Sequence, residues 1–351
     1  MEDNKDIERT ELEELGEFGL IDQLTQDFPL RNASSLKGVG DDAAVIDQDG
    51  YRTLVSVDLL LEGVHFDMTY TPLKHLGYKA AVVNFSDIYA MNGIPTQIVV
   101  GLGVSNRYSV EALDELYAGI RLACEAYGVD LVGGDTTSSR SGLVISITVI
   151  GRAKDEDVVY RSGAQPNDLL CVSGDLGGAY MGLLILEREK AEYMANPHMQ
   201  PQLQGFDYVL ERQLKPEARK DVVARLKELG IKPTSMIDIS DGLASEVLHL
   251  CKESGVGCQL YEDKIPLDPS TSKTAKDFQI VPSVAALSGG EDYELLFTIQ
   301  QKDYEKIQQM SEDVTVIGYM TADKGIAELI TPDNHVIPLK AQGWNHFKET
   351  H

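Results

Sequence analysis

Apolar residues along this chain follow two periods, one typical of buried strands and one typical of amphipathic helices. Three compact β-branched runs predict strands, at 53–61, 97–104 and 143–152. Residues 75–92 place apolar side chains at i, i+3, i+4 and i+7, which predicts a helix. A second helix is predicted over 110–127, with Ser109 as its N-cap and Gly128 at its end. Strands and helices in alternation predict a sheet covered by helices.

The second half of the chain continues the alternation. Residues 168–187 predict a strand, a glycine-rich turn and a helix, and 237–255 predict a strand end, a turn and a helix. A further helix is predicted over 216–229, and strands are predicted at 293–299 and 314–320. The fold class expected from these elements is α/β (α+β).

The length of 351 residues predicts two domains, each large enough for its own core. We place them at 1–152 and 153–351, where only the charged segment AKDEDVV marks the boundary. The segment 31–47 is rich in turn residues and is predicted to be a loop.

The charge of the chain limits its partners. Lysine and arginine number 31 against 56 acidic residues, a net charge of −25, which argues against general binding of nucleic acid or membrane surfaces. Four isolated cysteines, no signal-peptide pattern and no long apolar run lead us to expect a cytoplasmic protein without a membrane span. A phosphorylated small molecule remains compatible with this charge if cations lie between it and the protein.

Carboxylates recur beside Gly, Ser or Thr in loops or at the ends of the predicted elements, with Asp87 in the middle of a predicted helix among apolar neighbours. They are Asp41, Asp42, Asp58, Asp87, Asp135, Asp238, Asp241, Glu291 and Asp292. Each one alone is better explained as a turn residue or a helix cap. Together they sit in otherwise apolar segments with few basic residues near them, and oxygen ligands of this kind suit Mg²⁺ shared with substrate phosphates.

Other site types lack their motifs. The chain has no P-loop, no protein-kinase signature, no nucleophile elbow and no zinc spacing, and its Gly101-x-Gly103 lacks the rest of a dinucleotide fingerprint. The loop from Gly174 to Gly178 precedes a predicted helix and could cradle a phosphate, although packing in a tight turn is favoured.

Seven motifs, in one order and over nearly the whole chain, resemble the thiamine-monophosphate kinase family: GVGDDAAVI, SVDLLLEGVHF, NFSDIYAMNGIP, GGDTT, RSGAQPNDLL, IDISDGL and GGEDYEL. The resemblance implies phosphorylation of thiamine monophosphate by ATP with several Mg²⁺ ions, giving thiamine diphosphate. It also implies a two-domain aminoimidazole ribonucleotide synthetase-like fold, with the N-terminal sheet pairing across a homodimer.

Site residues follow from the same resemblance, position by position. Metal positions are Asp42, Ser56, Val57, Asp58, Asp87, Asp135, Asp238 and Asp241, and Val57 can contribute only its carbonyl oxygen. ATP positions are Tyr117, Gly134, Asp135, Arg161 and Ser240. Thiamine-phosphate positions are His65, Glu291 and Trp344, with Trp344 stacking on the cationic thiazolium and Glu291 complementing its charge.

The implied chemistry needs no general base, because a phosphate monoester with a second pKa of about 6 is already largely ionised at neutral pH. Positioning and electrostatic stabilisation would supply the rate. Two alternatives stay open at this stage: another ATP-dependent enzyme of the same superfamily, and a non-catalytic thiamine-phosphate binding protein. The first cysteine is Cys124, which counts against a selenophosphate synthetase with its reactive N-terminal cysteine.

Overall fold

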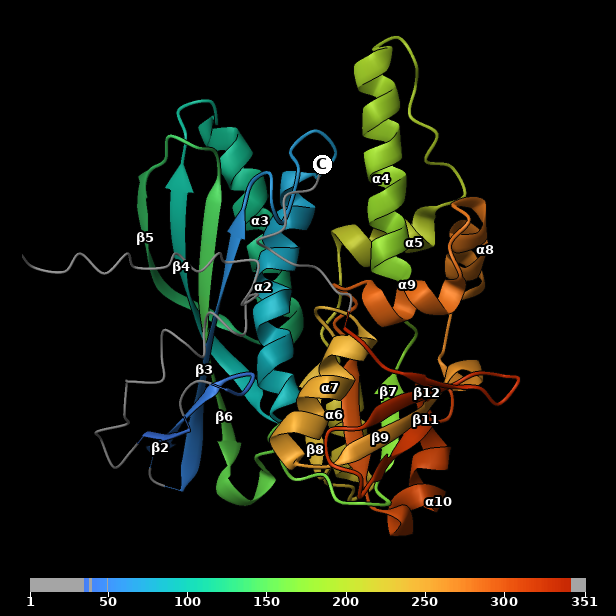
Figure 1. The fold of residues 1–351 in the computed structure, drawn as a ribbon. Helices are drawn as coiled ribbons and strands as arrows, with labels where there is room; N and C mark the ends of the chain where they lie inside the picture. The colour runs from blue at the N-terminus through green and yellow to red at the C-terminus, as the bar shows by residue number, and fades with distance from the viewer. Residues whose placement is uncertain (1–34, 38–39, 49, 342–351) are drawn as a thin grey trace, which may run out of the picture.

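Two β-sheets, one from each half of the chain, form the framework of the computed structural model (Figure 1). The structure describes residues 35–37, 40–48 and 50–341. The predictions for the acidic N-terminal segment and for Trp344 lie outside these ranges. The expected α/β architecture with two sheets is confirmed.

The first sheet has six strands in the order β1-β2-β3-β6-β4-β5. Neighbouring strands are antiparallel except β4 and β5, which run parallel. The strands are β1 Ser35–Lys37, β2 Ala44–Gln48, β3 Tyr51–Leu61, β4 Ile94–Val104, β5 Asp130–Ser138 and β6 Val144–Lys154. The three strands predicted from the apolar runs are β3, β4 and β6, so these predictions are confirmed.

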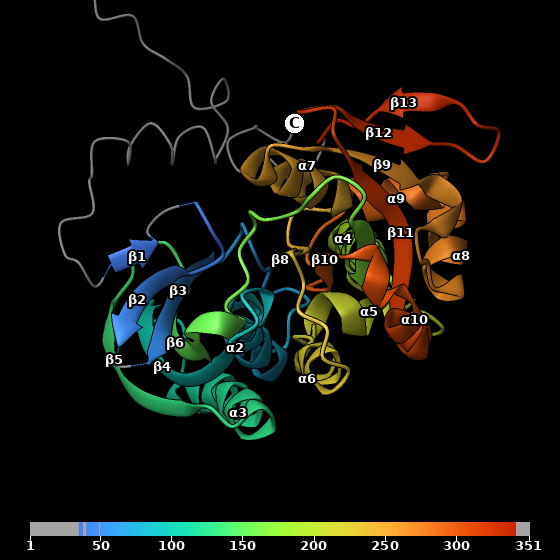
Figure 2. The ribbon, with the colours of Figure 1, turned by 90° about the horizontal axis from the view of Figure 1, so that it is seen from below.

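Two helices, α2 (Leu73–Ala90) and α3 (Val110–Tyr127), cover one face of this sheet (Figures 1 and 2). They pack closely, because an added Cβ would lie 1.9 Å from a carbonyl oxygen of the other helix at Gly77 and at Gly119. The Ser109 side chain accepts a hydrogen bond from Ala112 N, and Gly128 adopts φ 74°, as the capping pattern predicted. Helix α2 also contacts β8 of the second sheet, so it lies between the two halves.

The second sheet has seven strands in the order β13-β12-β9-β11-β7-β10-β8. The strands are β7 Leu169–Ser173, β8 Ser235–Asp238, β9 Gly257–Tyr261, β10 Leu295–Ile299, β11 Val314–Thr321, β12 Ala327–Ile330 and β13 Val336–Pro338. The helices of this half are α4 Gly178–Ala195, α5 Asp207–Leu214, α6 Lys220–Glu228, α7 Leu243–Ser254, α8 Pro269–Asp277, α9 Pro282–Ser288 and α10 Tyr304–Ile307. A separate core of apolar residues from β7, β8, β9, β10, β11 and α7 holds this half together.

Two sequence predictions need correction. The segment 31–47 contains β1 and most of β2, because the short apolar run around Val45 pairs with β3 and buries Val45 completely. The helix predicted over 216–229 begins only at Lys220. Arg219 leaves the helical region because its guanidinium binds the buried carboxylate of Glu294, with Nη1 2.6 Å from Oε2. A tertiary ion pair here overrides local propensity.

On the second face of the first sheet, apolar side chains are exposed to solvent. Val57 is 58% exposed and Leu59 is 50% exposed, while Leu54 and Leu60 on the opposite face are buried. Among the described elements, no helix covers this outer face (Figure 1). The same described part of the chain contains no helix with the length and hydropathy needed to span a membrane.

Candidate functional site

Helix α2 joins the two halves through polar side chains on an otherwise apolar helix. Ser56 Oγ, from β3, donates to Asp87 Oδ2 at 2.6 Å, and Asn84 Oδ1 accepts from Asp58 N at 3.1 Å. On the other side, Ser86 Oγ donates to Asp238 Oδ2 at 2.5 Å, at the end of β8. The middle of β3 and the end of β8, two strands from different sheets, therefore meet at one stretch of α2.

Three carboxylates converge at this point. Asp42, Asp87 and Asp238 each offer an oxygen, and these oxygens all lie within 4.8 Å of one another. Burial, with Asp58, Asp238 and Asp42 nearby, raises the pKa of Asp87 well above its usual range. Burial and the charge of Asp42 raise the pKa of Asp238 to about 8. Carboxylates this close favour either shared protons or a bound cation, and an all-oxygen donor set is the kind that Mg²⁺ prefers.

Arg161 is the cation that the structure places beside this cluster. Its Nε lies 3.0 Å from Asp42 Oδ2 and its Nη2 lies 2.8 Å from Asp42 Oδ1, a bidentate pair. Arg161 N also donates to Asp41 Oδ1 at 3.2 Å, and burial with the charge of Asp42 raises the pKa of Asp41 to about 6. A residue predicted to contact ATP thus pairs with one predicted to bind metal.

The DISDG and GGED motifs lie against each other. Ser240 O accepts from Glu291 N at 2.7 Å, and Ile239 O accepts from Tyr293 N at 2.9 Å. Glu291 and Tyr293 adopt φ 60° and 52°, a left-handed conformation that these backbone bonds hold in place. Tyr293 is half-buried, and burial, with the charges of Glu291, Asp58, Asp238 and Asp241 nearby, raises the pKa of its hydroxyl.

Glu291 is held by residues from both halves. Lys79 Nζ, on α2, lies 2.9 Å from Glu291 Oε1, and Gln213 Nε2, on α5, donates to Glu291 Oε2 at 2.8 Å. Lys79 Nζ also donates to Gln213 O at 3.1 Å. Each carboxylate oxygen therefore has one fixed donor.

His65 lies in the turn between β3 and α2, and its Nδ1 accepts from Leu61 N at 3.0 Å. Its neutral form therefore carries the proton on Nε2. Next to this turn is a cavity of about 340 Å³ lined by Glu62, Gly63, Asp67, Met68, Thr69 and Arg107.

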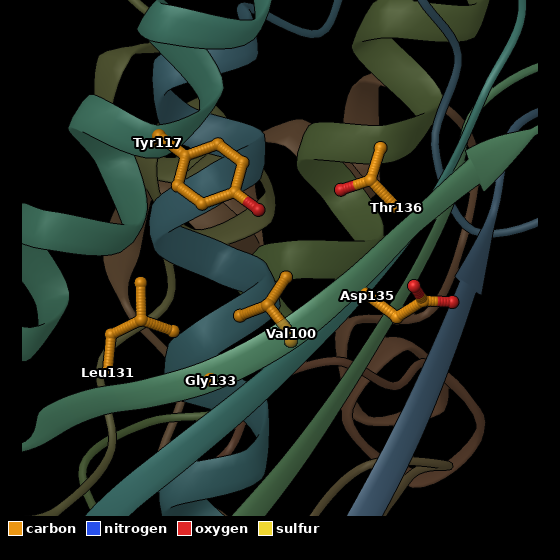
Figure 3. A pocket seen from close by; sticks show the side chains of 7 residues that line it. Val100, Tyr117, Leu131, Gly133, Asp135 and Thr136 are labelled. Carbon is orange, nitrogen blue, oxygen red and sulfur yellow. The ribbon is translucent and has the colours of Figure 1, made fainter.

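A second cavity, of about 490 Å³, lies where α3 faces the edge strand β5 (Figure 3). Its lining residues are Val100, Tyr117, Leu131, Gly133, Gly134, Asp135 and Thr136. It brings together Tyr117, Gly134 and Asp135, three of the residues predicted to bind ATP. Arg161 and Ser240 do not line it.

The strand register separates the predicted metal positions. Asp58 lies in register with Ile147, Val100 and Gly134, on the face that α2 covers. Asp135 and Val57 lie on the opposite, outer face, since Asp135 is in register with Gly101 and Val57 with Thr148. Within one chain, the structure therefore does not bring Asp135 to the cluster of Asp42, Asp87 and Asp238.

Several residues were missed by sequence reasoning. Lys79 and Ser86 were missed, although with the predicted Asp87 they stand at i, i+7 and i+8 on an apolar helix, which is a readable signal for one polar face. Glu246 was missed as well, although its buried Oε1 accepts from Asp241 N at 3.1 Å and its burial raises its pKa. Gln213 lies on a short helix with no motif around it, so nothing in the sequence marked it.

The glycine-rich loop before α4 is explained by packing. Asp292 Oδ2 accepts from Gly177 N at 2.7 Å and Oδ1 accepts from Ala179 N at 3.4 Å, so a carboxylate of the protein already occupies this helix N-terminus. Gly177 adopts φ 79° and leaves no room for a Cβ beside Ala285 and Ala286. The tight-turn alternative therefore fits this loop better than a phosphate cradle.

Known proteins resemble the chain in both halves. The family described as AIR synthase related protein matches with its N-terminal domain at 40–153 and its C-terminal domain at 154–330. Thiamine-monophosphate kinase of Bacillus subtilis (strain 168) is 34% identical over 339 residues, 95% of this chain and 100% of that protein. The kinase of the same name from Aquifex aeolicus (strain VF5) is 34% identical over 337 residues, 96% of this chain and 99% of that protein. A solved structure of AaThiL complexed with AMPPCP and TMP is 31% identical with a TM-score of 0.80, covering 96% of this chain and 99% of that chain.

Proposed function

The chain belongs to the thiamine-monophosphate kinase family, and we propose that it transfers the γ-phosphoryl group of ATP to thiamine monophosphate. The products are ADP and thiamine diphosphate. The observation that carries this proposal beyond family membership is the cluster of Asp42, Asp87 and Asp238, three carboxylates gathered where the two halves meet.

Magnesium is the cation that we propose for this cluster, held by Asp42, Asp58, Asp87 and Asp238. The donor set supports it, because the oxygens of Asp42, Asp87 and Asp238 are crowded, burial and neighbouring charges raise the pKa of Asp87 and Asp238, and a hard cation relieves the same repulsion. Bound Mg²⁺ would neutralise charge on phosphate oxygens and lower the barrier to phosphoryl transfer. Ser56, Val57, Asp135 and Asp241 stay predicted metal positions.

Nucleotide binding is proposed at the cavity beside β5. Tyr117 offers a ring face to a base, and Gly134 lets the strand backbone approach closely. Arg161 would exchange its bond to Asp42 for a phosphate when a cation takes Asp42, and Ser240 would add a hydroxyl near the same phosphates.

The chain's own residues then have two tasks. His65 and Glu291 orient thiamine monophosphate, and the cluster and Arg161 hold the phosphates of ATP. The acceptor phosphate is already ionised at neutral pH, so no side chain has to remove a proton from it.

A homodimer is proposed from the outer face of the first sheet, whose exposed apolar side chains suit a second copy of the same face. Pairing there would also bring two Asp135 side chains into the interface. We keep residues 1–152 and 153–351 as the proposed domains, and we propose a cytoplasmic enzyme, which the four free and buried cysteines support.

One assay tests the function. The purified protein is incubated with ATP, Mg²⁺ and thiamine monophosphate, and ADP and thiamine diphosphate are measured; equal amounts are expected, with no product after chelation of Mg²⁺. ADP without thiamine diphosphate would indicate another ATP-dependent reaction of the superfamily. Binding of thiamine monophosphate without either product would indicate a binding protein.

A further inference from the structure

Glu62 lies where three neighbouring strands of the first sheet end or begin. It follows β3, Arg107 and Tyr108 follow β4, and Leu143 precedes β6. Glu62 Oε2 accepts hydrogen bonds from Leu143 N and from Tyr108 Oη, both at 2.8 Å, and Oε1 pairs with Arg107 Nη2. Glu62 N also donates to Leu143 O at 3.0 Å. Backbone and side chain of Glu62 therefore fasten the end of β3 to the start of β6 and to the loop after β4.

The surroundings of this carboxylate leave it little freedom. The Glu62 side chain is 15% exposed, and a Cβ at Gly142 would lie 2.7 Å from its Oε2, so the neighbouring backbone closes against it. Desolvation raises the pKa of Glu62, but the hydrogen bonds from Leu143 N, Tyr108 and Arg107 outweigh it and hold the pKa below its usual range. Glu62 is therefore ionised at neutral pH and accepts these bonds in its charged form, in which they are stronger.

The turn that starts at Glu62 carries His65. His65 N donates to Leu61 O at 2.9 Å, and Gly63 N donates to Phe66 O at 2.8 Å. Gly63 adopts φ 83°, a left-handed conformation that glycine takes without strain. His65 Nδ1 accepts from Leu61 N at 3.0 Å, so the backbone next to Glu62 orients the imidazole. The direction of this ring thus depends on the shape of the turn.

The same segment surrounds the cavity of about 340 Å³ beside the turn. All of the lining residues except Arg107 belong to residues 62–69. At the far end of the segment, Asp67 Oδ1 accepts from Thr69 N at 2.7 Å, and Asp67 Oδ2 pairs with Lys190 Nζ of α4 at 2.7 Å. A carboxylate therefore anchors each end of the segment, and the shape of the cavity depends on both anchors.

His65 is predicted to contact thiamine monophosphate, so the groups that fix its turn set the geometry of that contact. We propose that Glu62 is a positioning residue for the thiamine monophosphate site, anchoring the turn that carries His65 to Leu143 N and to the Tyr108 hydroxyl. In this role Glu62 acts through His65 and does not itself touch the substrate. The inference rests on the proposed function and adds to it a residue outside the predicted binding positions.

Substitutions at the anchor test this role. Glu62→Ala removes the acceptor of three donors and should raise the KM for thiamine monophosphate about tenfold, with the KM for ATP changed by less than about twofold. Glu62→Gln keeps an oxygen that can accept from Leu143 N and Tyr108, so its KM for thiamine monophosphate should stay within about threefold of wild type. Arg107→Met removes only an ion pair whose arginine is 56% exposed, and it should change neither KM. An unchanged KM for thiamine monophosphate in Glu62→Ala, or an equal rise of both KM values, would overturn the proposal.

A double-mutant cycle separates positioning of His65 from any other effect of the substitution. In a His65→Ala background the group through which Glu62 acts is missing, so Glu62→Ala should change the KM for thiamine monophosphate by less than about twofold. The full effect in that background would show that Glu62 does not act through His65. Tyr108→Phe is a milder change that removes one donor; it should raise the same KM about threefold, and only where His65 is present. If Glu62→Ala does not fold, this variant decides the outcome.

Asp168→Ala is a matched control for the loss of a carboxylate anchor. Asp168 Oδ2 accepts from Gln165 N at 2.9 Å and from Thr234 Oγ1 at 2.7 Å, a backbone N–H and a hydroxyl as at Glu62. It precedes β7, at the end of the second sheet opposite to that of the carboxylate cluster. Asp168→Ala should lower the free energy of unfolding, as Glu62→Ala does, and leave both KM values unchanged. A rise in the KM for thiamine monophosphate in this control as well would assign the effect of Glu62→Ala to lost stability and overturn the positioning role.

The proposed function and the positioning role fail in different ways. A wild-type protein that makes no thiamine diphosphate from ATP and thiamine monophosphate overturns both. A wild-type protein that makes it, together with a Glu62→Ala variant of unchanged KM for thiamine monophosphate, overturns the positioning role alone.

Discussion

The fold holds Asp87 in surroundings that disfavour its ionised form. It accepts from Ser56 Oγ at 2.6 Å, yet burial and the charges of Asp58, Asp238 and Asp42 raise its pKa. Repulsion of this kind destabilises the metal-free fold and strengthens the binding of a cation. The same carboxylate therefore lowers the stability of the metal-free fold and serves the proposed activity.

Replacement of this carboxylate should separate stability from turnover. Asp87→Asn keeps the size and removes the charge, so the free energy of unfolding in chelator should stay equal or rise by about 1 kcal/mol. The rate of thiamine diphosphate formation with Mg²⁺ should fall roughly 100-fold or more. Denaturant titration and initial rates measure the two effects. Asp333→Asn, at an exposed turn, is the control that should change neither. Full turnover in Asp87→Asn would contradict the metal proposal.

The limit of sequence reasoning is also clear at this scale. Asp42, Asp87 and Asp238 could be predicted to share one site, because each is a carboxylate that belongs to a sequence motif within an otherwise apolar segment. The joint contact of Lys79 and Gln213 with Glu291 could not be predicted, since these two residues are 134 positions apart and meet Glu291 only through the packing of α2 against α5. A sequence motif identifies residues whose roles depend on their neighbours in the chain. Lys79 and Gln213 contact each other only in the folded structure, so no motif marks this contact.

Helix α4 shows an element stabilised from a distant motif. Asp292, from the loop before β10, accepts hydrogen bonds from Gly177 N at 2.7 Å and from Ala179 N at 3.4 Å. Its Oδ1 also lies 3.7 Å from Arg212 Nη2. A carboxylate at a helix N-terminus is favoured by the orphan N–H groups and the helix dipole. The GGED motif therefore contributes a structural carboxylate, Asp292, directly beside Glu291, the residue predicted to bind substrate.

The pH dependence of stability should report this cap. Burial, opposed by Arg212 and the two N–H donors, raises the pKa of Asp292 from 3.8 to about 6. A carboxyl whose pKa is higher in the folded than in the unfolded state stabilises the fold below pH 4, and this stabilisation is lost as the pH rises through 6. The unfolding free energy of wild type relative to Asp292→Asn should therefore decrease from pH 4 to 7 and then level off. A difference that increases with pH would refute this; urea titration at a series of pH values measures it.

Strand β5 offers a paired test of close packing. A Cβ at Gly134 would lie 2.1 Å from Val100 O, whereas a Cβ at Gly133 meets nothing within 4 Å. Gly134→Ala should force β4 and β5 apart, lower the unfolding free energy by roughly 1–3 kcal/mol and raise the KM for ATP. Gly133→Ala should change the unfolding free energy by less than about 0.5 kcal/mol. Thermal and denaturant unfolding measure both effects. If the two substitutions lower the unfolding free energy equally, the short distance from position 134 to Val100 O is not the reason that this position requires glycine.

At the scale of the whole molecule, alternation of strands and helices was enough to predict two α/β halves. The order of the strands was not predictable from it. The first sheet places β6 between β3 and β4, and the second places β9 between β11 and β12, arrangements decided by long-range pairing. The short strands β1, β12 and β13 were also missed, because three or four residues carry too little periodicity to identify a strand.

The net charge of −25 gains a different meaning once the structure is known. Part of it is the cluster at α2, where Arg161 supplies the bidentate partner of Asp42. Bound cations would neutralise this part, so the field met by two phosphorylated substrates is weaker than the formal charge suggests. A protein with this net charge can therefore repel nucleic acids and anionic membranes and still bind small phosphorylated molecules.

The exposed outer face of the first sheet leads to the last prediction. Leu59 is 50% exposed at its centre, in register with Ser146 and, through β4, with Asp135. A second copy would bury this apolar surface, and a charge placed there would have to be desolvated without a partner. The wild-type chain of 38.5 kDa should therefore behave as a dimer in light scattering, and Leu59→Glu as a monomer with reduced turnover. Val281→Glu introduces the same charge at a 59% exposed position of the second half and should leave the dimer intact. A monomeric wild type, or a Leu59→Glu variant that stays dimeric, would exclude this face as the interface.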